Sequence, residues 1–132
     1  MTTEANKALV RMWIDAWMRS DVVLLDQIFA PTYTVNGKHI GIEGVKQAVQ
    51  FLHSVLSDLS AELDDIIAED DKVVIRWTVR GRQVGDFMGV PATGRPLELT
   101  GINMYQVADG RIVANHEQTN VLEIVQRLKG TA

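Results

Sequence analysis

The spacing of apolar residues changes once along this chain, and that change limits the fold more than any other feature. Up to about residue 56, apolar side chains recur every three or four positions, as on the buried faces of helices. From about residue 61 they recur at every second position, as in strands with one buried face. Helices followed by a run of strands, without alternation of the two, predict an α+β fold rather than a doubly wound parallel sheet.

The expected elements follow from this spacing and from the turn and cap residues between them. Helices are predicted at about residues 3–20, 22–29, 45–56 and 121–128, the first of them capped by Thr2 or Thr3. A short strand is expected at 32–36, and longer strands at 61–68, 72–83, 96–107 and 111–120. No repeat or linker interrupts the chain, so residues 1–132 are expected to form one domain.

Composition narrows the classes of partner. Thirteen Lys and Arg against seventeen Asp and Glu give a net charge of −4 without a basic stripe, so nucleic acid is not an expected partner. The absence of cysteine excludes disulfides and thiolate chemistry. No apolar run approaches the roughly 20 residues that cross a bilayer, and the N-terminus lacks a secretory signal. We therefore expect a soluble, cytoplasmic protein without membrane association.

The last predicted hairpin carries the most informative polar residues. If Asp109–Gly110 forms a two-residue turn, Asn103 lies opposite His116, and both share a face with the apolar Ile112. A face that is apolar at one end and polar at the other is typical of a cup with a hydrogen-bonding mouth. A three-residue bulged turn would shift the pairing by one residue and turn Asn103 away from His116.

His116 is the candidate acid or base of such a cup, because imidazole exchanges a proton near neutral pH. Asn103 would fix its tautomer or bind an oxyanion, while Asn120 is either another orienting amide or the cap of the last helix. The scattered histidines predict no metal site. The side chains expected to contact a ligand are mostly aromatic: Trp13, Trp17, Tyr33, Trp77, Phe87 and Gln118.

Residues 73–113 carry the most specific sequence motifs. They read VVIRWTVRGRQVGDFMGVPATGRPLELTGINMYQVADGRIV, and the loop GDFMGVPATGR at 85–95 is the most distinctive part. With the closing VLEIVQRL segment, these motifs resemble the SnoaL-like polyketide cyclase family over nearly the whole chain. The resemblance implies the nuclear-transport-factor-2-like cone, in which a curved antiparallel sheet wraps around N-terminal helices and leaves a deep pocket.

The same resemblance implies a function. Characterised members close a ring by intramolecular aldol condensation without a cofactor, using a carboxylate near the end of the last strand, where this chain has Asn120. It therefore implies a cofactor-independent enzyme acting on a bulky apolar or aromatic carbonyl compound, with the proton-transfer role moved to His116. The alternative is a non-catalytic domain that binds such a small molecule, because the Asp is replaced by Asn120.

A homodimer is also expected. Members of the family that this chain resembles commonly pair through the sheet. One face of the strand at 72–83 mixes apolar and charged side chains in an unusual way for a purely solvated surface: Val74, Arg76, Thr78 and Arg80.

Overall fold

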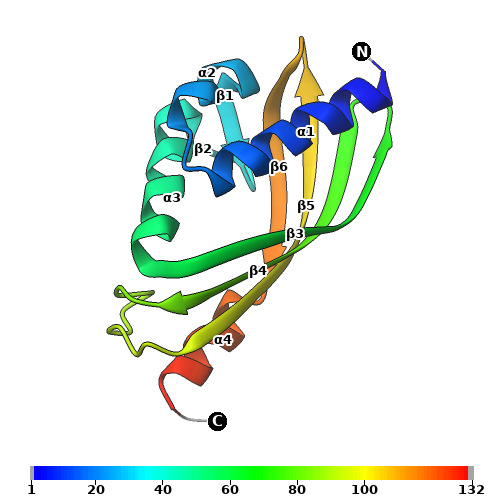
Figure 1. Ribbon diagram of the computed structural model, residues 1–132. Helices are drawn as coiled ribbons and strands as arrows, with labels where there is room; N and C mark the ends of the chain where they lie inside the picture. Colours follow the sequence, from blue (N-terminus) through cyan, green and yellow to red (C-terminus); the bar gives the residue numbers. More distant parts are fainter. Residues whose placement is uncertain (1, 131–132) are drawn as a thin grey trace.

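A curved sheet of six strands forms the frame of the protein in this computed structural model, which describes residues 2–130 (Figure 1). The spatial order of the strands is β2-β1-β6-β5-β4-β3. In chain order they are β1 (Phe29–Val35), β2 (Lys38–His39), β3 (Leu56–Glu69), β4 (Lys72–Gln83), β5 (Pro96–Ala108) and β6 (Arg111–Thr119). The predicted α+β class is confirmed, but β1 runs parallel to β6, so the sheet is mixed rather than wholly antiparallel.

The longer helices lie in the first half of the chain, as predicted. Figure 1 shows α1 crossing one face of the sheet, with α3 beside β1 and α4 at the far end of the molecule. The helical segments are α1 (Thr3–Met18), the 3₁₀ turn η1 (Val22–Leu24), α2 (Leu25–Ile28), α3 (Gly41–Val55) and α4 (Val121–Leu128). Within residues 2–130, no helix is long and apolar enough to cross a membrane.

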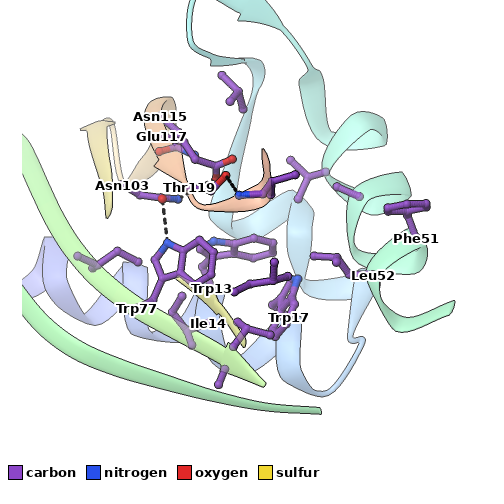
Figure 2. Close-up of a pocket in the computed structure, with 18 of the residues that line it drawn as sticks. Trp13, Ile14, Trp17, Phe51, Leu52, Trp77, Asn103, Asn115, Glu117 and Thr119 are labelled. Atoms are coloured by element: carbon purple, nitrogen blue, oxygen red, sulfur yellow. Dashed lines mark hydrogen bonds between the residues drawn. The ribbon is translucent and has the colours of Figure 1, made fainter. Parts of the chain in front are cut away.

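The cap of α1 follows the predicted chemistry. The Thr2 hydroxyl accepts a hydrogen bond from the backbone N–H of Ala5 at 3.0 Å, which satisfies one free donor of the first turn. Three turns later, Trp13 and Trp17 project from α1 towards the sheet (Figure 2). Trp13 packs edge-on against Phe29, with ring centroids 4.8 Å apart. The helix therefore contributes indole side chains to the space beneath it.

The boundaries of several elements differ from the expectations. Strand β1 begins at Phe29 instead of residue 32, because Phe29 is fully buried and pairs with Ile112 of β6. The short strand β2 was not predicted. Helix α3 begins at Gly41, whose φ of +66° is accessible to glycine without strain. Strand β3 begins directly after α3, at Leu56.

The last hairpin contains the irregularity that decides the site. Asp109 and Gly110 have φ values of +51° and +75°, as the predicted two-residue turn requires. Val107 pairs with Ile112, as this turn predicts, but Gln106 then pairs with Ala114. The predicted pairing of Asn103 with His116 is therefore wrong, and Asn103 lies opposite Glu117. The extra residue is a β-bulge, which changes which alternate side chains of β6 face inward.

Candidate functional site

A cavity of about 430 Å³ lies between the helices and the inner face of the sheet (Figure 2). Helix α1 contributes Trp13, Ile14 and Trp17 to its wall, and α3 contributes Phe51 and Leu52. The volume falls within the range of roughly 300–1,000 Å³ that is usual for small-molecule pockets. Most of the lining side chains are apolar or aromatic, so the cavity suits a ligand with a sizeable apolar body.

One wall of the cavity is polar and belongs to β5 and β6. Asn103 and Tyr105 of β5 lie directly opposite Glu117 and Asn115 of β6. All four line the cavity, and Thr119 continues the row. The bulge near Val113 is the reason, because it turns residues 115, 117 and 119 inward instead of 116 and 118.

A continuous set of hydrogen bonds fixes this wall. The Trp77 indole N–H donates to Asn103 Oδ1 at 2.9 Å, so the amide orientation is set. Asn103 Nδ2 then donates to the Tyr105 hydroxyl at 3.0 Å and to Glu117 Oε1 at 3.2 Å. The Trp13 indole N–H donates to the same hydroxyl at 3.1 Å. Asn103 therefore joins the Tyr105 hydroxyl and the Glu117 carboxylate through one nitrogen.

Burial keeps both tyrosines of the cavity in the neutral form. It raises the pKa of Tyr105 to about 12, although the hydrogen bonds from Asn103 and Trp13 favour the phenolate. The pKa of Tyr33 is raised far above its usual range, mainly by burial and secondly by the nearby Tyr105. A hydrogen bond from Asn115 opposes this shift. Both hydroxyls therefore keep their protons at neutral pH.

Asn115 presents an acceptor without a partner. Its side chain is only 4% exposed, and its Oδ1 makes no hydrogen bond among the described residues. Buried polar atoms of this kind are uncommon, because each one loses its hydration without compensation. Asn115 lines the cavity, but this oxygen is itself buried, so a ligand would reach it only after the side chain moves.

The loop with the distinctive motif forms part of the cavity wall. Gln83 is fully buried, and its Nε2 donates to the backbone carbonyls of Val90 and Pro91 at 3.0 and 3.2 Å. Its Oε1 accepts from the Thr93 hydroxyl at 2.7 Å. These bonds hold the loop so that Phe87 lines the cavity. The threonine of the motif thus has a structural role, because its side chain bonds to Gln83.

The predicted site residues divide into two groups. Six of them line the cavity, although their roles in binding remain predictions: Trp13, Trp17, Tyr33, Trp77, Phe87 and Asn103. His116 and Gln118 are exposed on the outer face of the sheet, so the expectation that they face the cup is wrong. The bulge is the physical reason, since without it His116 would lie opposite Asn103.

The sequence reasoning missed three polar site residues, Glu117, Asn115 and Tyr105, and Glu117 is the one with a carboxylate. The signal was present in Ile112, Val113 and Ala114, three consecutive apolar residues in a strand that otherwise alternates. A bulge adds one residue to one strand, so an interruption of the apolar–polar alternation within that strand is typical of it. With one residue allowed for a bulge, the alternation would have placed Glu117 inside.

Asn120 lies outside the cavity lining and has a structural role. It occupies the N-cap position of α4, as one of the two expectations had it, but its side chain makes no cap hydrogen bond. Instead, Oδ1 accepts from the Thr100 N–H at 2.9 Å, and Nδ2 donates to the Glu98 carbonyl at 3.2 Å. The amide therefore ties the start of α4 to β5.

We predict that Asn120→Asp destabilises the fold by about 1–3 kcal/mol at pH 7, because a carboxylate oxygen would face the Glu98 carbonyl in place of an N–H donor. That contact raises the folded-state pKa of the new carboxyl group. The loss should therefore be present above this raised pKa and absent below the unfolded value of about 4. Urea unfolding at pH 7 and at pH 4 measures it. Asn120→Ala, which has no charge, should lose the same stability at both pH values, and equal losses for Asn120→Asp would contradict the prediction.

A comparison with known families identifies the chain. The profile of the SnoaL-like polyketide cyclase family matches residues 7–128. The chain belongs to this family. The resemblance inferred from the motifs at 73–113 is thus confirmed, and this SnoaL-like chain has the fold that the family implies.

Solved structures agree with this family assignment. TsrD from Streptomyces laurentii is 30% identical with a TM-score of 0.89, covering 100% of this chain and 99% of that one. IdmH from Streptomyces antibioticus is 29% identical with a TM-score of 0.81, covering 94% and 98%. A SnoaL-like polyketide cyclase from Agrobacterium tumefaciens, at 16% identity, TM-score 0.83 and coverage of 97% and 99%, shares the fold. Among curated proteins, no significant match was found.

Proposed function

We propose that this SnoaL-like protein catalyses a cofactor-independent proton transfer on a bulky apolar or aromatic carbonyl compound, with Glu117 as the acid/base. The observation that carries the proposal is a carboxylate on the polar wall of an otherwise apolar cavity. Glu62 also lines the cavity, but it is exposed and paired with Arg80. Among the described residues, the Glu117 carboxylate accepts a side-chain hydrogen bond on Oε1 from Asn103, and none is found on its other oxygen, which is left for a ligand.

The proposed reaction is the one that begins an intramolecular aldol ring closure. The Glu117 carboxylate takes a proton from the carbon next to a carbonyl, and the C–H electron pair forms the enolate. The enolate carbon attacks a second carbonyl of the same molecule, and the proton on Glu117 passes to the new alkoxide. The apolar walls contribute by holding the two reacting ends close together.

Deuterium exchange tests the proposal without knowledge of the natural substrate. The methyl protons of 2-acetylnaphthalene, a neutral aromatic ketone, lie next to its carbonyl. In D₂O, the protein should exchange these protons faster than buffer alone, with a rate that saturates as the ketone fills the cavity. Proton NMR follows the loss of the methyl signal. A bound ketone whose protons exchange only at the buffer rate would contradict the proposal.

The alternative is a domain that binds a small molecule without chemistry. The observation in its favour is Asn120, which stands where the family has Asp and whose amide is occupied by β5. Trp13 and Trp17 line the cavity, so a bound ketone should change the tryptophan fluorescence. A fluorescence change without accelerated exchange supports the binding function instead.

We also propose a homodimer that forms through the outer face of the sheet. Ile102 on β5 is 52% exposed there, and Arg76 and Arg80 on β4 are exposed beside it. Thr78 does not contribute, because it is buried and bonded to Asp64. Sedimentation at micromolar concentration should give twice the mass of one chain, and the Ile102→Glu variant should give the mass of a single chain. A monomeric wild-type protein would contradict this proposal.

A further inference from the structure

The hydroxyl oxygen of Tyr105 accepts two N–H donors and has no lone pair left. The Trp13 indole N–H lies 3.1 Å away and Asn103 Nδ2 lies 3.0 Å away. Neither donor can change its role, because an indole N–H only donates, and Trp77 holds the Asn103 oxygen on the opposite side. The one remaining hydrogen-bonding capacity of this hydroxyl is its own proton.

Within residues 2–130, no hydrogen bond from the Tyr105 hydroxyl proton to an acceptor is found. Tyr105 is 2% exposed, so bulk water does not supply one, yet the residue lines the cavity. The raised pKa of Tyr105, caused mainly by burial, keeps the proton in place at neutral pH. A ligand in the cavity is therefore the natural source of an acceptor for it.

We propose that the Tyr105 hydroxyl donates a hydrogen bond to the carbonyl oxygen of the ligand and stabilises the negative charge on that oxygen while Glu117 removes the neighbouring proton. This inference rests on the proposed function of the same cavity. Tyr105 and Glu117 are both bonded to Asn103 Nδ2, so the donor and the base stand side by side. In a ketone, the carbonyl oxygen and the hydrogen on the adjacent carbon are also close together, so one ligand can contact both groups.

The arrangement suits charge stabilisation for two physical reasons. First, the two N–H groups that donate to the Tyr105 oxygen polarise its O–H bond and make it a stronger donor. Second, the hydroxyl is fixed before the ligand arrives, so little reorganisation is needed when charge develops. In the step itself, the electron pair of the broken C–H bond becomes the enolate, and Tyr105 keeps its proton. The proton that moves goes to Glu117.

The carbonyl stretching frequency of a bound ketone tests this hydrogen bond directly. 2-Acetylnaphthalene labelled with ¹³C at the carbonyl should show a lower frequency in the wild-type protein than in Tyr105→Phe. His116→Ala, which changes an exposed side chain on the outer face of the same sheet, should keep the wild-type frequency. Equal frequencies in the wild type and in Tyr105→Phe would overturn the proposal.

This measurement separates the inference from the proposed function. It detects a hydrogen bond in the bound state whether or not exchange is catalysed. A lowered frequency without exchange supports the role of Tyr105 as a donor and contradicts the role of Glu117. Catalysed exchange without a lowered frequency supports the role of Glu117 and contradicts the role of Tyr105.

Kinetics supply a second readout. Tyr105→Phe should lower kcat for proton exchange about 10²-fold with little change in KM, as for the loss of one oxyanion donor. Trp13→Phe keeps the Tyr105 hydroxyl but removes one of the two N–H groups that polarise it. Its carbonyl stretching frequency and its kcat should therefore lie between those of the wild type and those of Tyr105→Phe. If Tyr105→Phe does not fold, as judged by circular dichroism, the Trp13→Phe frequency decides. A wild-type value there would overturn the proposal.

Discussion

Glu117→Gln is expected to lower the rate of proton exchange on 2-acetylnaphthalene by about 10²–10⁴-fold, the usual contribution of one general acid or base. Glutamine has nearly the same size and still offers a carbonyl oxygen to Asn103 Nδ2, so the polar wall should keep its shape. An amide cannot take up a proton at neutral pH, so the substitution removes the acid/base function together with the negative charge of the carboxylate. Initial rates by NMR measure the loss, and tryptophan fluorescence shows whether the ketone still binds.

His116→Ala is the matched comparison, because His116 is the next residue on the same strand and points to the opposite face. We expect its exchange rate to stay within about twofold of the wild type, and its stability within about 0.5 kcal/mol, as for most surface substitutions. A large loss in His116→Ala with little loss in Glu117→Gln would restore the histidine hypothesis. It would also show that β6 presents its other face to the cavity.

The fold could be predicted because it depends on local patterns. The change of apolar spacing near residue 60 separates helices from strands, and it holds whatever the sheet curvature. The Asp109–Gly110 turn is equally local, since both residues tolerate positive φ. The partners of β1 were less accessible, because its parallel pairing with β6 joins segments about 80 residues apart, and nothing near Phe29 indicates it.

The inward-facing residues of the last strand could not be predicted by alternation alone. A single extra residue near Val113 reverses which side chains face the core for the rest of β6. Alternation counted from the turn selects His116, whereas alternation counted from the bulge selects Glu117. The expected site was therefore wrong by one residue on β6, while Asn103 on the regular strand β5 was placed in the cavity wall.

The hydrogen bonds of the polar wall depend on contacts that sequence spacing does not contain. The bond from Trp13 to Tyr105 joins residues 92 positions apart, and the bond from Trp77 to Asn103 joins residues 26 apart. From the sequence, these tryptophans were expected only as side chains that contact a ligand. In the structure the indole N–H groups of Trp13 and Trp77 are used to orient other polar groups.

Gly101 is the position on which the placement of Trp77 depends. A Cβ added there would overlap the Trp77 ring, lying 2.6 Å from Cε2, and would also lie 3.0 Å from the Gln118 carbonyl oxygen. Neither neighbour can move aside easily, because the Trp77 side chain is held by Asn103 and the Gln118 atom belongs to the backbone. Only a residue without a side chain lets the indole lie across β5 and reach Asn103.

Gly101→Ala is therefore expected to destabilise the protein by about 3 kcal/mol, from overpacking of about 1–3 kcal/mol and the lost Trp77–Asn103 hydrogen bond of about 1 kcal/mol. Urea unfolding measures the loss, and the indole N–H signal of Trp77 in proton NMR should shift. In the Trp77→Phe background the smaller ring leaves room, so adding Gly101→Ala should cost much less. If Gly101→Ala is as stable as the wild type and the indole signal does not move, Trp77 does not lie over Gly101. The Asn103 amide would then be free to turn, and neither Glu117 nor Tyr105 would have the fixed partner on which their proposed roles depend.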